Sequence, residues 1–247
     1  MGKIIAVVSG KGGTGKTSFT ANVGLALAAL GCSTLCLDCD ITLRNLDLAL
    51  GLSDRALMDF TDVIAGRCTL EDAVVQHPKY PKLHLLTAPL SARPVPIAPE
   101  QMKALLDRIR QTYDYCLIDA PAGLGMGFHL SSDYADRAVV VTNTDASSLR
   151  DAQRTVMELD RLGRGNLHLV VGRVEKKLLR SLHTTIDDAM NTAGLPLIGV
   201  IPEDAQVMLC ANRGIPLTSQ GRKGAAMACR NIAWRLMGRR VPIMRIR

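Results

Sequence analysis

Short runs of apolar residues alternate along the chain with longer segments whose apolar positions recur at helical spacing. Residues 4–8 form one uninterrupted apolar run, which is typical of a strand buried on both faces. Alternation of buried strands with helices predicts a three-layer α/β fold, with a mainly parallel sheet between two layers of helices. We expect strands at residues 3–9, 34–39, 83–88, 115–119, 138–142, 167–171 and 197–201. We expect helices near residues 16–30, 100–112, 147–162, 178–191 and 219–237.

The domain organisation follows from length and from the one proline-rich segment. Residues 91–99 contain three prolines, and we interpret them as a stiff loop that is too short to separate two domains. The chain has 247 residues, of which 47% are hydrophobic, so it can bury a substantial core and is not intrinsically disordered. We therefore expect one domain over residues 1–238, followed by a short basic tail over residues 239–247.

Basic residues are concentrated at the end of the chain. The formal net charge is +7, from 30 Lys and Arg against 23 Asp and Glu. Asp204 is the last acidic residue, so the body of the chain is slightly acidic and the end is strongly basic. An anionic partner is expected near that end. The nine basic residues after Asp204 are Arg213, Arg222, Lys223, Arg230, Arg235, Arg239, Arg240, Arg245 and Arg247.

Cysteine usage and apolar run lengths indicate a cytoplasmic protein. The seven cysteines are scattered through apolar segments, as in reduced proteins. Cys36 and Cys39 have C-x-x-C spacing, but side chains three apart on a strand point to opposite faces, so we interpret them as core residues. The run at residues 4–8 is too short for a signal peptide, and no run approaches the roughly 20 apolar residues of a membrane span.

A glycine-rich loop follows the first expected strand and precedes the first expected helix. Residues 10–17 fit the pattern G-x-x-x-x-G-K-[ST], in which glycines let backbone N–H groups surround phosphate oxygens. Lys16 is expected at the β- and γ-phosphates, Thr17 at Mg²⁺ and Ser18 at the α-phosphate. A ligand-free glycine turn would not explain the Lys-Thr pair at its end. The expected phosphate-binding residues are Gly10, Lys11, Gly12, Gly13, Thr14, Gly15, Lys16, Thr17 and Ser18.

Three aspartates stand where a phosphate site needs carboxylates. Asp38 and Asp40 close the second expected strand, and Asp119 ends the hydrophobic run at residues 115–118. The carboxyl ends of parallel strands meet at one edge of a sheet, so we expect these acids beside the loop, holding Mg²⁺ and orienting water. The alternative for each is a solvated strand-end residue that caps the next helix. Gly123 lies four residues after Asp119 and can sense the γ-phosphate through its N–H group.

Several sequence motifs, including the glycine-rich loop, resemble those of a known family. The loop carries an extra lysine, Lys11, and further characteristic strings occur at residues 38–48, 119–123, 147–151 and 199–204. Together they resemble the deviant Walker A ATPases of the MinD/ParA family, and the MinD branch more than the ParA branch, over nearly the full chain. The resemblance implies a P-loop NTPase fold, ATP or ADP with Mg²⁺ as cofactors, and slow, partner-stimulated hydrolysis of ATP. It also implies a role in septum site selection during cell division.

The resemblance assigns roles to individual residues. ATP is expected to drive formation of a homodimer, in which Lys11 reaches the phosphates of the opposite subunit. Asp40 and Asn45 are expected to position the attacking water, so the expected catalytic residues are Lys11, Lys16, Asp40 and Asn45. The expected metal residues are Thr17, Asp38 and Asp119, with Asp119 acting through the water shell of Mg²⁺. Pro202, Glu203 and Asp204 are expected against the adenine.

The resemblance also predicts partners. A division inhibitor and an ATPase-activating protein are expected on the surface from Ser147 to Arg154. Relatives in the MinD branch usually end in an amphipathic membrane helix, whereas this chain stops about where that helix would begin. Its own basic segment, Arg239 to Arg247, is therefore a candidate contact with the inner face of an anionic membrane. A second departure is at residues 171–175, where Glu175 takes over the base contact that relatives often make with an asparagine.

Two other functions compete with this interpretation. ParA-like ATPases bind DNA non-specifically through basic patches, but aromatic stacking residues are scarce here and no DNA-binding domain is appended. An ATPase like the nitrogenase iron protein needs cysteines after the switch regions, and none lies between Asp119 and Thr142. We therefore expect a MinD-like switch, with a ParA-like positioning ATPase as the alternative and DNA as the less favoured partner.

Overall fold

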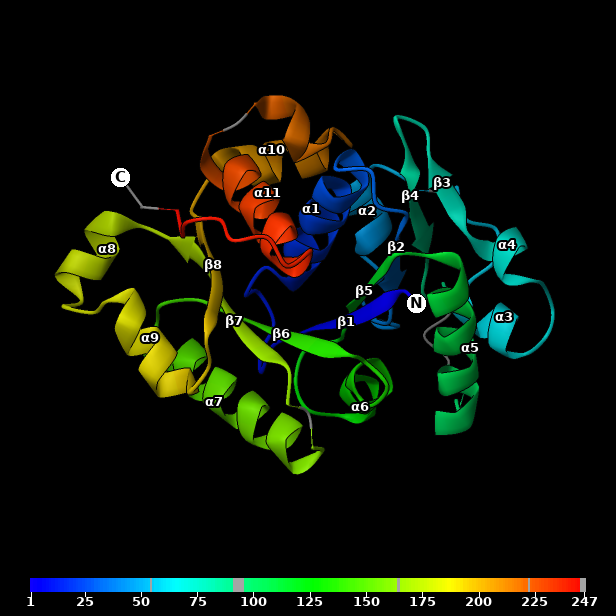
Figure 1. Ribbon diagram of the computed structural model, residues 1–247, viewed down its shortest axis with the longest axis horizontal. Helices are drawn as coiled ribbons and strands as arrows, with labels where there is room; N and C mark the ends of the chain where they lie inside the picture. The colour runs from blue at the N-terminus through cyan, green and yellow to red at the C-terminus, as the bar shows by residue number, and fades with distance from the viewer. Residues whose placement is uncertain (54, 91–95, 164, 222, 245–247) are drawn as a thin grey trace.

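The computed structural model describes residues 1–53, 55–90, 96–163, 165–221 and 223–244. In these residues eight strands form one sheet in the order β3-β4-β2-β5-β1-β6-β7-β8 (Figure 1). Every neighbouring pair is parallel except β3 with β4. The strands are β1 (Lys3–Val8), β2 (Thr34–Asp38), β3 (Val75–His77), β4 (Tyr80–Leu86), β5 (Tyr115–Asp119), β6 (Arg137–Thr142), β7 (Leu167–Val174) and β8 (Leu197–Pro202).

Helices cover both faces of the sheet, which confirms the expected three-layer α/β fold. In Figure 1, α1, α10 and α11 lie on one side of the sheet, and α5, α6, α7 and α9 lie on the other. The helices are α1 (Lys16–Ala29), α2 (Leu46–Leu50), α3 (Phe60–Ile64), α4 (Leu70–Ala73), α5 (Pro99–Thr112), α6 (Met126–Ser132), α7 (Ala146–Arg161), α8 (Lys176–Ser181), α9 (Ile186–Ala193), α10 (Ala205–Asn212) and α11 (Gly224–Leu236), with a 3₁₀ helix, η1, at Leu217–Gln220.

The central strand β1 shows why residues 4–8 include no polar residue. Ile4, Ala6 and Val8 pack into the core beneath α5, α6, α7 and α9, whereas Ile5 and Val7 pack against α1 and α11. Successive side chains of a strand point to opposite faces, so a strand between two helix layers buries both sets. The uninterrupted apolar run is therefore the consequence of burial on two sides.

The cysteine pair behaves as predicted. Cys36 packs on the face of α1 and α2, and Cys39, which follows β2, packs into the core on the other face. Both thiols are buried, and burial raises the pKa of each well above its usual range. Within the described residues all seven cysteines are free thiols. The C-x-x-C spacing is thus a feature of the core.

Two helix predictions need correction. The expected helix at residues 178–191 is divided into α8 and α9, because His183 adopts a left-handed φ of 50° and Thr185 starts a new helix through a capping box with Asp188. The expected helix near residues 219–237 begins only at Gly224, after η1. Gly221 and Gly224 have φ of 98° and 54°, conformations that interrupt a helix.

The sequence also left some elements unassigned. The edge strand β3 was not predicted, because three residues are too few to show a period of two. The short helices α2, α3, α4, α6 and α10 were missed as well. The apolar stripe expected in the last helix is confirmed, since Ala225, Ala228, Cys229, Ile232 and Leu236 of α11 are all buried. The expected loop at residues 91–99 lies partly outside the described residues.

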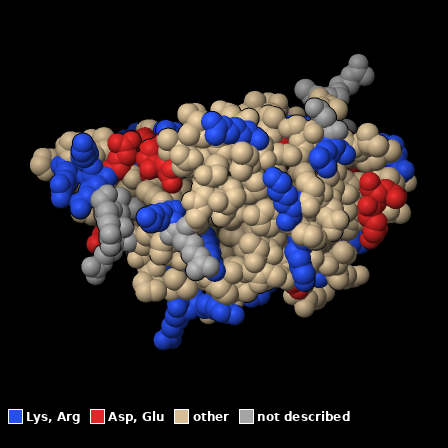
Figure 2. Space-filling view, turned by 90° about the horizontal axis from the view of Figure 1, so that it is seen from above, with Lys and Arg blue, Asp and Glu red and all other residues tan. Residues whose placement is uncertain are grey.

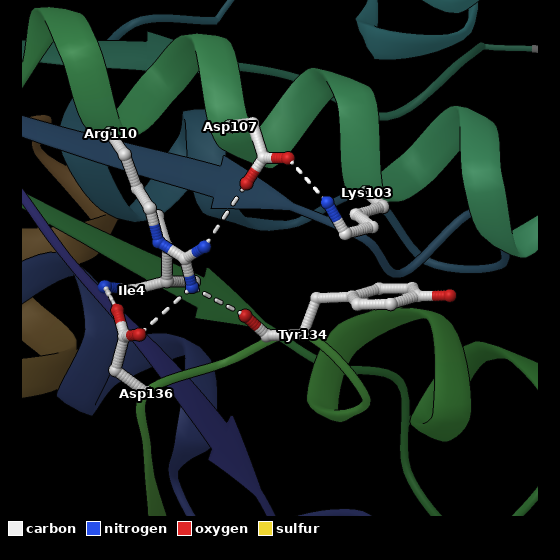
Figure 3. A network of polar contacts seen from close by, with 6 residues as sticks. All are labelled: Ile4, Lys103, Asp107, Arg110, Tyr134 and Asp136. Atoms are coloured by element: carbon white, nitrogen blue, oxygen red, sulfur yellow. Dashed lines mark hydrogen bonds and ion pairs between the residues drawn. The ribbon is translucent and has the colours of Figure 1, made fainter.

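A polar network closes the amino edge of the sheet, the edge at which the parallel strands begin (Figure 3). Arg110 of α5 donates to the carbonyl of Tyr134 at 2.7 Å and to Asp136 at 2.9 Å. The other carboxylate oxygen of Asp136 accepts the N–H of Ile4 in β1 at 2.7 Å. Asp107 bridges Arg110 and Lys103 along α5. The network fastens α5 to the first residues of β1 and β6.

The C-terminal segment turns back onto α11. Arg235 donates to the carbonyls of Ile198, Val241 and Pro242, and the Arg239 guanidinium lies 3.9 Å from the centre of the Trp234 ring. The expected basic tail is thus held against α11 as far as Pro242, and residues 245–247 lie outside the described part. The face that α10 and α11 share carries many Lys and Arg and few Asp and Glu (Figure 2). Among the described residues, no helix is both long and apolar enough to cross a bilayer.

Candidate nucleotide-binding site

The glycine-rich loop joins β1 to α1 in the expected context. Gly13 and Gly15 have φ of 80° and 95°, and a Cβ placed on either would meet nothing within 4 Å. Side chains rarely adopt these angles, so glycine is required by backbone conformation and the space beside it stays open. Gly10 packs so tightly on the backbone of Asp151 in α7 that an added Cβ would lie 2.5 Å from its carbonyl oxygen.

The amino end of α1 faces this loop without a cap of its own. Its N-cap residue is Gly15, no side chain accepts a hydrogen bond there, and the first turn contains no acid. The first N–H groups of a helix need acceptors, and the helix dipole adds positive charge, so this end is suited to an anion. Thr14 is also buried with its hydroxyl unpaired among the described residues. These features fit phosphate oxygens.

Lys16 lies beneath the loop and is only 8% exposed. Its ammonium group donates to the Ser9 hydroxyl at 2.9 Å, and that hydroxyl donates to the carbonyl of Lys11 at 2.7 Å. Burial lowers the pKa of Lys16, while the nearby carboxylates of Asp119 and Asp40 oppose this shift. Among the described residues the Lys16 ammonium group thus has one neutral hydroxyl as its hydrogen-bond partner, an arrangement that a phosphate would complete.

Asp38 and Asp119 lie side by side at the carboxyl edge of the sheet. They are register partners in the β2–β5 pair, and both are buried. Burial raises the pKa of Asp38 to about 7 and that of Asp119 to about 6, and their mutual repulsion adds to the shift of Asp38. The structure thus brings these two acids together at the carboxyl edge, and their expected role in holding Mg²⁺ stays a prediction.

A hydroxyl of α1 completes this cluster. Thr17 donates to one oxygen of Asp119 at 2.6 Å, and Thr20 lies 3.4 Å from the other oxygen. Hydroxyl and carboxylate oxygens are the ligands that Mg²⁺ prefers, and Mg²⁺ sites beside phosphates use few protein groups. No group of three or more His, Cys, Asp and Glu that could enclose a metal occurs in the described ranges, so a metal here would depend on phosphate and water oxygens.

Residues 39–45, which we call the first switch segment, follow Asp38 directly. Asp38 accepts the N–H groups of Asp40 and Leu46, and Asp40 accepts those of Thr42 and Leu43. Asn45 precedes α2 and is exposed, with no capping hydrogen bond from its side chain. The buried aspartate therefore anchors both ends of a loop that holds Asp40 and Asn45, and the catalytic roles of these two residues stay predictions.

Lys11 points to α7. Its ammonium group donates to Ser147 at 2.8 Å and to Asp145 at 3.3 Å, and Ser147 in turn donates to Asp145 at 2.6 Å. Asp145 caps α7 by accepting the N–H of Ser148, and these contacts hold its pKa below the usual range even though burial opposes them. The sequence predicted a helix start at Ser147, whereas Asp145 as the cap of this helix and the contact of both residues with Lys11 were not predicted.

Residues 120–126, which we call the second switch segment, follow Asp119. The N–H of Gly123, the expected phosphate sensor, donates to the carbonyl of Ser9 at 3.2 Å. Beyond it Leu124 and Met126 are exposed, Met126 to 75%. In the first switch Leu43 is similarly exposed. Apolar side chains thus stand at both switch segments.

The expected base contacts lie where β7 and β8 end. The N–H of Glu203 donates to the carbonyl of Val174 at 3.1 Å, and its carboxylate accepts from Arg173 at 2.9 Å. Asp204 accepts the N–H groups of Gln206 and Ala225, so its carboxylate caps α10 and fastens it to α11. Glu175 is exposed at the start of α8. The expected adenine contacts stay predictions for Pro202, Glu203, Asp204 and Glu175. The sequence analysis did not predict the ion pair of Arg173 with Glu203.

Known proteins are similar to this chain in sequence and fold. A family model described as an AAA domain matches residues 2–169. The septum site-determining protein MinD of Bacillus subtilis is 38% identical over 98% of this chain and 92% of its own length. The MinC:MinD cell division complex of Aquifex aeolicus has 36% identity and a TM-score of 0.91 over 98% of each chain. MinD of Pyrococcus horikoshii, complexed with Mg-ADP, has 30% identity and a TM-score of 0.84 over 96% of each chain.

The three-layer fold, the uncapped helix behind a glycine loop and the two lysines define a P-loop ATPase with a deviant Walker A motif. Relatives that are more than 30% identical over almost the whole chain are MinD proteins. The chain belongs to the MinD family of septum site-determining ATPases. The resemblance expected from the sequence is confirmed.

Proposed function

We propose that this protein is an ATP-controlled switch for septum site selection, which dimerises when ATP is bound and is reset by hydrolysis. The observation that carries the proposal is the position of Lys11, which belongs to the phosphate loop but is paired with α7 of its own chain. Support comes from relatives: one is solved with Mg-ADP and another in complex with MinC. A ParA-like DNA-binding role has less support, because these relatives are MinD proteins.

Nucleotide binding would use the side chains and backbone N–H groups around the phosphate loop. Lys16 and the N–H groups at the start of α1 would hold the phosphates, and Thr17 with Asp119 and Asp38 would hold Mg²⁺. Mg²⁺ supplies positive charge to the phosphates and favours the ionised form of both buried carboxylates. Asp40 and Asn45 would orient the attacking water from the loop that Asp38 anchors.

Dimerisation would exchange the partners of Lys11. The side chains of Lys11 and Asp145 are 36% and 48% exposed and Ser147 is exposed, so releasing Lys11 from these contacts costs little. At the opposite site Lys11 would meet a triphosphate and stabilise the charge that develops during hydrolysis. Leu43, Leu124 and Met126 of the two switch segments would be buried between the subunits. The same residues thus link ATP, dimer and catalysis.

The first experiment separates binding from dimerisation. Lys16→Ala is expected to abolish nucleotide binding, whereas Lys11→Ala is expected to bind ATP as a monomer and to fail to dimerise. Binding is measured by calorimetry and mass by light scattering with ATP and Mg²⁺. Lys79→Ala is the matched control, because Lys79 is an exposed lysine between β3 and β4. Unchanged dimerisation of Lys11→Ala would overturn the exchange of Lys11 partners.

The exposed face of α7 is the proposed site for the division inhibitor and the activating protein. Ser147, Arg150 and Arg154 are exposed there. Ser147 holds Lys11, and the backbone of Asp151 packs on Gly10 of the loop. A protein bound to this face would therefore touch the elements that hold Lys11, which offers a route from partner to hydrolysis. Arg150→Glu is expected to weaken partner-stimulated hydrolysis and to spare basal hydrolysis.

The tail is the proposed membrane contact. Arg239 and Arg240 stand beside Ile243, which is 40% exposed, and each basic residue adds about 1 kcal/mol near an anionic bilayer. Two tails in an ATP dimer would bind far better than one. We expect ATP-dependent sedimentation with anionic vesicles, and its loss in a chain ending at Gly238. Absent binding, or binding that survives truncation, would contradict this role, and salt-dependent binding of DNA instead would favour the ParA-like alternative.

A further inference from the structure

The end of β7 contains a strained residue beside the nucleotide site. Arg173 has a φ of 53°, in the left-handed region that non-glycine residues rarely adopt. It lies where the pairing of β7 with β8 shifts register, between Val171 and Val174. A strained conformation persists only when its surroundings enforce it, and such residues gather at ligand-binding sites. The left-handed backbone at Arg173 therefore indicates a ligand-binding role for this end of β7.

The side chain of Arg173 is committed to Glu203. Its Nε donates to Oε2 of Glu203 at 2.9 Å, across the ends of β7 and β8. The backbone of Glu203 is fixed as well, because its N–H donates to the carbonyl of Val174. With exposed fractions of 60% and 37%, the two side chains lie at the surface of the site. An exposed ion pair adds little stability, so stability alone does not account for the strained backbone.

The position of this pair corresponds to the base end of the nucleotide. Gly172 abuts the phosphate loop, because a Cβ placed on it would lie 3.5 Å from the carbonyl oxygen of Thr14. Asp38 and Asp119 occupy the other side of the loop, at the ends of β2 and β5. Nucleotides lie across the carboxyl ends of parallel strands, so phosphates that face β2 and β5 leave the base toward β7 and β8.

We propose that Arg173 is a positioning residue that holds the Glu203 carboxylate to select a purine with an amino group at C6. The inference rests on the proposed binding of ATP. An ionised carboxylate only accepts hydrogen bonds, and with Oε2 held by Arg173 its remaining lone pairs can accept from a 6-amino group. A 6-oxo purine would present an acceptor to an acceptor, a mismatch worth roughly tenfold to a hundredfold in affinity.

The test compares ATP with inosine triphosphate, which carries an oxo group at C6. Dissociation constants of both are measured by calorimetry with the full chain and Mg²⁺. We expect the unmodified chain to prefer ATP by about tenfold or more, and Glu203→Gln to reduce that ratio because an amide can also donate. Arg173→Gly keeps the left-handed backbone, so we expect it to fold, to bind ATP more weakly and to reduce the same ratio.

A matched control isolates the guanidinium from the backbone. His183 also has a left-handed φ, of 50°, and is exposed after α8, so His183→Gly makes the same backbone change without removing the ion pair. It is expected to leave the ratio unchanged. Equal affinities in the unmodified chain, or an unchanged ratio in Glu203→Gln or Arg173→Gly, would overturn the inference while ATP binding stands. Failure of the unmodified chain to bind either nucleotide would overturn the proposed function as well.

Discussion

The two edges of the sheet hold their charged side chains differently. At the amino edge Arg110 donates to Tyr134 and Asp136 and bridges to Asp107, and its side chain is only 16% exposed. At the carboxyl edge Asp38 and Asp119 are buried beside each other, and burial raises the pKa of both carboxyls. The cationic partner is part of the fold at one edge, whereas the other edge concentrates acids against a phosphate loop.

This difference separates groups that stabilise the fold from groups that serve a ligand. Arg235 repeats the pattern of Arg110 near the start of β8, since its guanidinium donates to three backbone carbonyls. Lys16, by contrast, donates only to the Ser9 hydroxyl within the described residues. A buried charge with incomplete partners destabilises the empty protein, and a ligand that supplies the missing charge recovers that free energy.

Among changes at the two edges, Asp119→Asn at the carboxyl edge is expected to have the largest effect on stability and hydrolysis. The amide still accepts from Thr17 but removes one of two adjacent buried charges, so the nucleotide-free protein should gain about 1–2 kcal/mol in unfolding free energy at pH 7. Loss of the carboxylate near Mg²⁺ should lower ATP hydrolysis by roughly 100-fold. Urea unfolding and a phosphate-release assay measure the two effects.

The outcome that would contradict this prediction is a loss of stability in Asp119→Asn. A nucleotide-free variant that is less stable than the unmodified chain would mean that the ionised carboxylate stabilises the fold, as the acids of the amino edge do. Asp62→Asn is a useful control, because Asp62 pairs with Arg67 and, in the first turn of α3, accepts the N–H of the N-cap residue Asp59. That change should lower stability, since the exchange removes a favourable partner.

The second prediction concerns Arg110. Arg110→Ala should lower the unfolding free energy by about 2–3 kcal/mol, because it removes the donor of the Tyr134 carbonyl and of one carboxylate oxygen of Asp136. Nucleotide affinity should stay unchanged, since the network lies at the opposite edge. Arg108→Ala is the matched control on the same helix, where an exposed contact of 3.9 Å with Glu71 should be worth less than about 0.5 kcal/mol. A changed ATP dissociation constant in Arg110→Ala would show that the two edges are coupled.

The carboxyl edge was more predictable from the sequence than the amino edge. The loop pattern and the aspartates at strand ends are local signals, and parallel strands bring their carboxyl ends together, so Asp38 and Asp119 could be placed beside Lys16. Seven of the eight strands were expected for the same reason, since each has its own apolar run. Arg110 and Asp136 carry no such signal, because their pairing depends on how α5 packs on the sheet.

Other features depend on contacts between distant parts of the chain. Lys11 meets Asp145 and Ser147 across 134 and 136 residues, and no local pattern predicts that pairing. The left-handed Arg173 arises from the register shift between β7 and β8. The docking of the tail depends on Arg235. The helical pattern correctly places this residue in the last helix, but it does not identify the carbonyls that accept its hydrogen bonds. The composition and the spacing of hydrophobic positions therefore predict the layers of the fold, whereas tertiary packing determines which charged side chains come into contact.

Arg239→Ala is expected to have the smallest effect on the unfolding free energy. This cation of the amino edge has a ring face as its partner, so Arg239→Ala should cost less than about 1 kcal/mol. Trp234 is the only tryptophan in the sequence and is half-buried, so removing the guanidinium should shift its emission toward longer wavelengths as water reaches the ring. Arg240→Ala is the neighbouring control and should leave the spectrum unchanged. An equal shift in both variants would mean that the tail as a whole covers Trp234, and emission during vesicle binding would then report undocking of the tail.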